Sequence, residues 1–448
     1  MKNSFCCWWK STCWAGPMVL VLSLGASTQA QQRWTLPQCL AQAQQHSLEL
    51  QLAQVAQRKS AAQLTGARRL FLPTIEARVR SASNWGFLVD PSTNELSNRF
   101  NFGNQAALNL SLNLFDGFAT TNQLKLRRQQ LAAADYDYQA RANQVQLEVA
   151  AAFLQVLLAQ EHLLNSRQRA AALARQEQKV KAQIARGTLS KRDLLAVQSQ
   201  VAAEGLLTVG AENSAERARF DLQQLLGLPA QPELAVQPVP LAAGPTAAEA
   251  VSLAEALTAA AAWLPELRAA QTRIEAAGYA RQLVRASYRP ALALTGQVAT
   301  RTSNYEDQRF GLQARDNLNR QLGVSLLIPL FNQLQLRTAD HVARLEELAA
   351  QLSYQQVARA VQGRVGAALL ECRAAARRYQ ALQLQYQAAE AEYRYAEKVF
   401  ELGGTDAVAF GVTRSRLVGA QSELVQAKYD WWFKQQILAF YQGKPLAL

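Results

Sequence analysis

The sequence predicts an α+β membrane protein in which one half, made of a helix, two strands, a long helix and a second helix, occurs twice. The first observation is the stretch LNLSLNLFDGF at 108–118, where leucine alternates with asparagine or serine. Such alternation is typical of a strand with one apolar and one polar face. The second is the segment 119–185, which is rich in alanine, glutamine, leucine and arginine and contains no proline. At 1.5 Å per residue it predicts a rod of roughly 100 Å.

The third observation is an internal duplication. The motif LFDGF at 114–118 matches LFNQL at 330–334, a shift of 216 residues, and upstream the shift becomes 217. Because only one residue of drift appears over the matched length, we interpret the halves as copies of one unit. The predicted domains are a first repeat at 31–229, a Pro-rich connector at 230–251 and a second repeat at 252–448. Pairs at these shifts include Arg128 with Arg344, Gly187 with Gly403, Gly227 with Gly443, and Pro73 with Pro290.

Each repeat yields the same order of elements. A first helix ends before a proline that cannot continue it, and two strands joined by a polar loop form a hairpin, at 74–115 and at 291–331. A long helix then reaches a glycine-containing tip, near 187 and near 403, and a shorter helix returns. The expected helices are 36–67, 119–185 and 190–226, then 252–285, 335–401 and 406–441; the expected strands are 74–82, 105–115, 291–300 and 320–331, with loops at 84–98 and 303–317.

The N-terminus predicts an exported chain. Lys2 and Lys10 precede the apolar run 18–26, and small residues up to Ala30 suit a cleavage site, so 1–30 is interpreted as a signal peptide. The net charge of +13 is spread among glutamines along helical stretches. This favours solvated helix faces over a nucleic-acid site. Cys39 and Cys372 lie far apart on predicted helices and suggest no disulfide framework, and no further apolar segment long enough to span a membrane is expected.

The four strands have the length needed to cross an outer membrane at a tilt. An ordinary soluble sheet is the alternative, but the adjoining helices show no apolar patch suited to cover one. Four strands cannot close a barrel, and an open edge in lipid leaves backbone groups unpaired. Two copies would give eight strands around a filled interior, and three copies give twelve with room for water. The polar row, which predicts the barrel lumen, favours three copies; its residues are Asn109, Ser111, Asn113 and Gln297.

In this arrangement the chain resembles the TolC-type outer-membrane efflux proteins over essentially its whole length after 36. The motifs that carry the resemblance are LFDGF at 114–118, RGTLSKRDLLAVQSQ at 186–200 and LLGLP at 225–229. The resemblance implies a homotrimer whose twelve-stranded barrel in outer-membrane lipid continues into a helical coiled-coil tunnel in the periplasm. It implies passive export in a tripartite efflux or type I secretion system, with a periplasmic membrane-fusion adaptor and an inner-membrane pump of the RND, ABC or MFS type.

The resemblance also assigns the two tips to contact with the adaptor, although an ordinary turn between two helices explains their glycines equally well. Some family members carry acidic residues just after the second tip, where they surround the periplasmic entrance. Here Asp193 keeps the acid in the first half, whereas Ala409 and Val412 occupy the matching positions in the second, and Asp406 is a possible substitute. The tip residues are Arg186, Gly187, Thr188, Leu189 and Ser190, and Leu402, Gly403, Gly404, Thr405 and Asp406.

No motif for catalysis or for a cofactor is found. The three histidines, His46, His162 and His341, are isolated, and the sequence contains neither a nucleophile elbow nor a phosphate-binding loop. We therefore expect neither an enzyme nor a bound cofactor. The alternatives kept open are a periplasmic coiled-coil adaptor or scaffold and a basic nucleic-acid-binding protein. The sequence does not name the cargo, although positive charge along the tunnel would favour anions.

Overall fold

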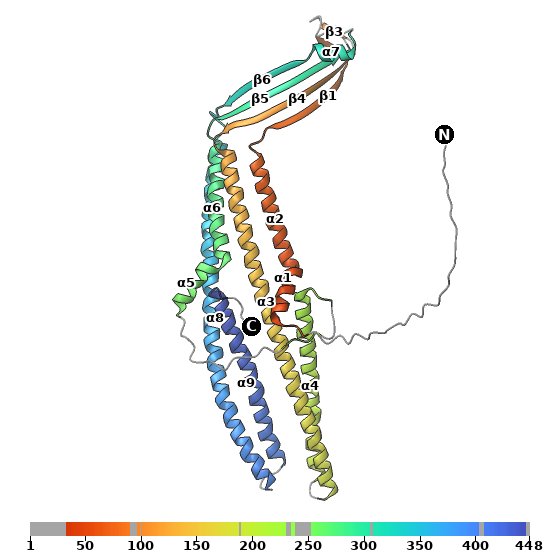
Figure 1. Ribbon diagram of the computed structural model, residues 1–448, viewed down its shortest axis with the longest axis vertical. Coiled ribbons are helices and arrows are strands. Elements are labelled where there is room, and N and C mark those ends of the chain that lie inside the picture. Colours follow the sequence, from red (N-terminus) through yellow and green to blue (C-terminus); the bar gives the residue numbers. More distant parts are fainter. Residues whose placement is uncertain are drawn as a thin grey trace, which may run out of the picture.

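The computed structural model describes residues 33–89, 96–98, 100–187, 190–229, 234–237, 252–304, 308–402 and 407–444. A curved sheet lies at one end of the molecule, and long helices run away from it as a bundle of rods (Figure 1). The predicted order of helix, strands, long helix and return helix is present in both halves.

Two helices of 67 residues form the axis of the bundle. They are α3, Ala119–Ala185, and α8, Gln335–Glu401. Their bounds agree with the expected 119–185 and 335–401. The return helices α4, Lys191–Leu226, and α9, Ala407–Tyr441, pack along the lower parts of α3 and α8. Far from the sheet, the rods end as two separate helical hairpins (Figure 1).

Each first helix is broken in two, which the sequence reading missed. The helix expected over 36–67 is α1, Leu36–His46, and α2, Leu48–Arg69; the one expected over 252–285 is α5, Leu253–Trp263, and α6, Pro265–Ala286. Leu264 adopts an extended conformation because it precedes Pro265, whose ring excludes the helical region for the residue before it. Ser47 takes nearly the same conformation without a proline, so the sequence carries no comparable signal there.

The main sheet is entirely antiparallel, with strand order β1–β4–β5–β6. The two hairpins expected from the sequence are β1 with β4 and β5 with β6, and they join side by side through β4 and β5. Consequently all four strands form one continuous surface. The strands are β1, Thr74–Asn84; β4, Asn101–Asp116; β5, Ala291–Ser303; and β6, Asn319–Leu327.

The loops at the outer end of the sheet are more ordered than predicted. The first contains a short hairpin, β2, Phe87–Val89, with β3, Leu96–Asn98, and the second contains the helix α7, Phe310–Asp316. The amide oxygen of Gln313 accepts a hydrogen bond from the backbone N–H of Ser303 (2.9 Å), which ties α7 to β5. Strand β6 ends at Leu327, four residues before the predicted 331, since Pro329 lacks an N–H for the ladder.

Both junctions from strand to long helix turn through two consecutive left-handed residues. In the first half these are Gly117 (φ 65°) and Phe118 (φ 72°), and in the second Gln333 (φ 55°) and Leu334 (φ 61°). The pairs are 216 residues apart, so the duplication extends to backbone geometry. The carboxylate of Asp116 accepts hydrogen bonds from the backbone N–H of Thr120 (2.8 Å) and from its hydroxyl. Asp116 therefore caps the start of α3.

The largest core lies halfway along the rods, where α1 packs against α3 and α4. Val149, Phe153 and Leu222 are buried there, and Trp34 extends the core by pairing with the connector, accepting and donating backbone hydrogen bonds with Gln237 and Ala235. A smaller core in the second half joins α5, α6 and α8 around Val365. These cores hold the short upper helices onto the long rods.

The thiol of Cys39 in α1 is predicted to be unreactive toward thiol reagents in the folded protein. Its side chain is 0% exposed, and burial raises the pKa of the thiol to about 12. Because the thiolate is the reactive form, roughly one thiol in ten thousand is ionised at about pH 8. A maleimide should leave Cys39 unmodified in the folded protein and modify it after unfolding, as measured by intact mass in a Cys372→Ser background. Modification at similar rates before and after unfolding would contradict the packing of α1.

Two helices, α3 and α4, each contain an 18-residue window apolar enough to cross a membrane by length and composition, with mean hydropathy of 1.3 and 1.2. The sequence analysis predicted no further apolar segment long enough to span a membrane. By length and composition, that prediction was wrong. In α3, 44% of the window is buried within the chain, among the residues of the largest core. In α4 only 6% is buried, which leaves an apolar helix face open on one side of the lower rod.

Candidate functional site: a two-faced sheet, two open edges and two tips

The strand register places one polar row across the whole sheet. Asn109 on β4 lies opposite Glu76 on one side and Gln297 on the other, and Gln297 lies opposite Gln321. The side-chain amide of Gln297 donates a hydrogen bond to Asn109 (2.9 Å). Ser111 pairs with Thr295, and Asn113 pairs with Ala293 just before a register shift that ends at Phe115. The four residues predicted for the lumen therefore share one face of the sheet.

The opposite face is apolar and points away from the rest of the chain. Leu110 lies between Ile75 and Gly296, and Gly296 is followed across the sheet by Leu322. Leu322 is 76% exposed, and its neighbours on β6 are similarly uncovered. An apolar surface of this extent requires an apolar partner, and no element of the described chain covers it. The exposed apolar residues of this face include Ile75, Val79, Leu108, Val298, Leu322, Val324 and Leu326.

Exposed aromatic side chains gather at both ends of the apolar face, a feature the sequence reading missed. An apolar band flanked by two aromatic girdles is typical of a transmembrane barrel, because aromatic rings favour the boundary between lipid and water. The signal was available as aromatic residues flanking each strand. They are Phe71, Phe115, Phe118, Tyr288 and Phe331 at the helical end, and Trp85, Phe87, Phe100, Phe102 and Phe310 at the loop end.

The chain has two long open edges. In the upper bundle α2 contacts α3, α3 contacts α6, and α6 contacts α8. These four helices are joined in the chain to β1, β4, β5 and β6, so their order across the bundle is the order of the strands in the sheet. One edge is therefore formed by β1 and α2, and the other by β6 and α8 (Figure 1). Below, α4 continues the first edge beside α3, and α8 continues the second beside α9.

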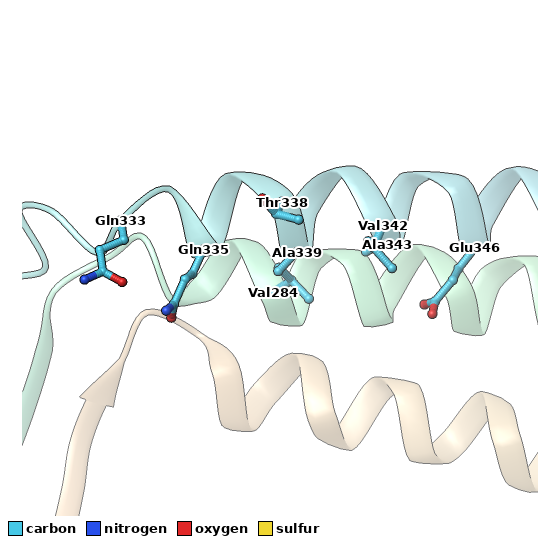
Figure 2. Close-up of a pocket in the computed structure, with 8 residues that line it drawn as sticks. All are labelled: Val284, Gln333, Gln335, Thr338, Ala339, Val342, Ala343 and Glu346. Carbon is cyan, nitrogen blue, oxygen red and sulfur yellow. The ribbon is translucent and has the colours of Figure 1, made fainter.

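A shallow groove lies on the second edge, just below the sheet. Figure 2 shows that its walls come from the start of α8, with Val284 contributed by α6. Small side chains such as Ala339 and Ala343 form its floor, and Glu346 lies at its lower end. A groove of this kind suits a packed helix, since small residues allow close approach of another backbone. Its lining residues are Val284, Gln333, Gln335, Thr338, Ala339, Val342, Ala343 and Glu346.

The first tip joins α3 to α4. Arg186 and Gly187 end α3, with Gly187 in the left-handed region (φ 79°) and exposed. Ser190 starts α4 through a capping box: the carboxylate of Asp193 accepts from the backbone N–H (3.0 Å) and hydroxyl (2.7 Å) of Ser190. Thr188 and Leu189 lie outside the described residues.

The Asp193 carboxylate is thus engaged at its own helix start. The hydrogen bond from Ser190 holds the pKa of the Asp193 carboxyl below its ordinary value. The stabilisation that accompanies this shift is present above the unfolded-state pKa of an aspartate and is lost as the pH falls through the lower folded-state pKa. Asp193 is therefore ionised throughout the neutral range while it caps α4.

The second tip joins α8 to α9. Leu402, at the end of α8, is 88% exposed, and Ala409 and Val412 on α9 are also exposed. The rings of Phe400 and Phe410 stack with centroids 4.7 Å apart and hold the two helices together beside the tip. The remaining predicted tip residues, Gly403, Gly404, Thr405 and Asp406, lie outside the described residues.

A family model of outer membrane efflux proteins matches the chain at residues 39–228 and again at 256–444. The chain belongs to this family. Among curated proteins, the alkaline protease secretion protein AprF of Pseudomonas aeruginosa is 24% identical over 348 residues, which are 75% of this chain and 69% of AprF.

Solved structures share the fold at low sequence identity. The Campylobacter jejuni CmeC outer membrane channel has a TM-score of 0.78 and 17% identity, covering 92% of this chain and 87% of CmeC. The open state of the Neisseria gonorrhoeae MtrE outer membrane channel has a TM-score of 0.73 and 18% identity, covering 92% of this chain and 89% of MtrE. The resemblance to TolC-type channels is confirmed.

This outer membrane efflux protein is a passive exit duct and not an enzyme. It resides in the outer membrane, with its helical rods in the periplasm. The alternative of a periplasmic adaptor or scaffold is not favoured. Proteins of this family form trimers and work with adaptors and inner-membrane pumps in efflux and secretion.

Proposed function

We propose that three copies of this chain close into one water-filled duct and that an inner-membrane pump drives cargo through it. The observation that carries this proposal is the pair of open edges. Strands β1 and β6 end the sheet, and each continues into an uncovered helix edge. In lipid, an unpaired strand edge costs several kcal/mol for each unsatisfied backbone group. The edges must therefore meet the edges of other copies.

Joining the β6 edge of one copy to the β1 edge of the next gives a head-to-tail interface. Such an interface produces a closed ring when the rotation between copies divides a full turn. Three copies of four strands give a twelve-stranded barrel. Two copies would give eight strands, whose interior is filled by side chains, whereas the row of Glu76, Asn109, Gln297 and Gln321 favours a water-filled interior.

The helices below the barrel are arranged for the same head-to-tail contact between copies. Since α8 follows β6 and α2 precedes β1, the groove on α8 lies beside α2 of the neighbouring copy. At the level of the groove, α2 exposes the small residues Ala62, Thr65 and Gly66. Its exposed Leu48, Leu52 and Val55 lie farther from the sheet and supply an apolar surface for the part of α8 below the groove. Arg58 and Lys59 are exposed eleven and ten residues before the end of α2, at the depth of Glu346, which is eleven residues into α8, and they offer it opposite charge.

The two tips at the far end of the rods are proposed as the surfaces for a periplasmic membrane-fusion adaptor. Their residues are Arg186, Gly187, Thr188, Leu189 and Ser190, and Leu402, Gly403, Gly404, Thr405 and Asp406. Exposure of Gly187 and Leu402 at the ends of their helices supports this. The pump on the other side of the adaptor belongs to the RND, ABC or MFS type. The name of AprF, a protease secretion protein, supports secretion as one use of such a duct.

The entrance is proposed to lie at Asp193, Ala409 and Val412. Two of these side chains are apolar, and the carboxylate of Asp193 caps α4. The entrance of this duct therefore presents one carboxylate per chain at these positions, and that carboxylate is already hydrogen-bonded within the tip.

Planar-bilayer recording tests the duct. Full-length protein extracted from outer membranes with detergent should insert and give uniform single-channel steps, because the closed ring surrounds a continuous water path. Protein that has been unfolded and diluted without refolding serves as the control for detergent leakage. Stable insertion without any conductance above that control would contradict the duct.

A further inference from the structure

The polar face of the sheet carries a group of arginines toward its loop end. Arg78 and Arg80 lie on β1, and Arg301 lies on β5. Arg80 and Arg301 both lie opposite Gln105, one on each side of β4. They are two strand spacings apart, about 10 Å. The side chains of Arg78, Arg80 and Arg301 therefore project from one face, the same face as Asn109 and Gln297.

Within the described strands, little negative charge balances these arginines. On the polar face of the four strands, Glu76 lies 3.9 Å from Arg78, and both side chains are more than two-thirds exposed. An exposed pair at this distance contributes little and leaves its charges available to solvent. Within the part of the chain that the structure describes, neither Arg80 nor Arg301 forms an ion pair. Both guanidinium groups are left facing the polar side.

We propose that these arginines form a cationic band in the outer half of the barrel and make the duct prefer anions. This inference rests on the proposed trimeric barrel, which brings six arginines, three copies each of Arg80 and Arg301, around one lumen. At about 0.1 M salt the screening length is about 10 Å, comparable with the spacing of neighbouring arginines. Their fields therefore overlap, raising the local concentration of anions and lowering that of cations.

The band also indicates a chemical class of cargo. Guanidinium groups bind carboxylate and phosphate through two parallel hydrogen bonds, which a bulk positive potential alone does not provide. The duct thus favours small solutes that carry carboxylate or phosphate groups over cationic ones. The exposure of Arg78, Arg80 and Arg301 keeps the bound anion in contact with water, so it can leave.

Ion selectivity in planar bilayers tests the band. Full-length wild-type protein is placed in a gradient of potassium chloride, and the reversal potential gives the chloride-to-potassium permeability ratio. This ratio should exceed one, and in the double variant R80Q/R301Q it should fall by about threefold or more at roughly 0.1 M salt. The difference should shrink at about 1 M salt, where the screening length is about 3 Å.

The matched control is Arg320→Gln. Arg320 lies on β6 opposite Val298, on the apolar face, so its loss removes the same charge from the same sheet but from the other side. R320Q should keep the wild-type ratio. If R80Q/R301Q gives no channels, the charge-retaining R80K/R301K and the two single variants replace it; R80K/R301K should keep the ratio and each single variant should lower it.

A conducting wild-type channel that prefers potassium, or an unchanged ratio in R80Q/R301Q, would overturn the band while leaving the duct intact. An equal fall in R320Q would also overturn it, because the effect would then not depend on the face. Absence of conductance in the wild-type protein would instead overturn the duct itself.

Discussion

Replacing Leu322 by arginine is expected to cost about 2–4 kcal/mol per chain, because a positive charge on the lipid face of a barrel near the middle of the bilayer carries that penalty. Leu322 lies on the apolar face opposite Gly296 and is 76% exposed in the single chain. In a ring of three chains the penalty occurs three times. The variant should therefore assemble poorly in lipid vesicles, measured as the fraction of protein that migrates as a folded oligomer before heating.

Gln321→Arg is the matched control for this prediction. Gln321 is the preceding residue of the same strand, and it lies opposite Gln297 on the polar face. An arginine there meets water, so assembly should stay close to that of the wild type. Equal loss of assembly in both variants would show that the faces do not meet different solvents, and the assignment of lipid and lumen would be wrong.

Gly117→Ala is expected to destabilise the protein by about 2–5 kcal/mol, the sum of left-handed strain and overpacking. Gly117 has a φ of 65°, and an added Cβ would lie 2.5 Å from the carbonyl oxygen of Ala286 and 2.7 Å from the Cβ of Arg289. Arg289 cannot move freely, since it donates to the carbonyl oxygen of Gly117 (3.3 Å) and lies over the ring of Phe118. The free energy of unfolding in detergent, from denaturant titration, measures the effect.

Gly187→Ala separates the two contributions. Gly187 is also left-handed (φ 79°), but among the described residues nothing beyond its chain neighbours lies within 4 Å of an added Cβ. It should cost about 1–2 kcal/mol, from backbone strain alone. If G117A cost no more than G187A, the close approach of the first strand–helix junction to the end of α6 would be refuted.

The parts of the fold that rest on local periodicity could be predicted from the sequence. Alternation of period two located the strands and their faces, so Asn109 and Gln297, far apart in the chain, were both assigned to the polar side. Helical periodicity without proline gave α3 and α8 their bounds. The duplication then checked each half against the other, because a strand or junction found once was expected again 216 residues later.

The parts that depend on contacts between distant segments could not be predicted. Nothing in β4 or β5 alone specifies that they pair with each other, and that pairing places Arg80 and Arg301 on either side of Gln105. The break at Ser47 falls at a residue with no proline or glycine beside it. The helix α7 is held by a contact outside its own segment, the bond from Ser303 to Gln313. By contrast, the cap formed by Ser190 and Asp193 is predictable from the sequence, because a serine followed three residues later by an acidic residue is a local signature of a helix start.

The mass of the detergent-extracted complex tests most directly whether three chains share one barrel. Light scattering of outer-membrane extracts, corrected for bound detergent, gives the number of chains in each particle independently of shape. Three chains per particle is the predicted result, because it closes four strands per chain into twelve. A monomer or dimer that is soluble without detergent would contradict the account, since the apolar face of the sheet would then never meet lipid.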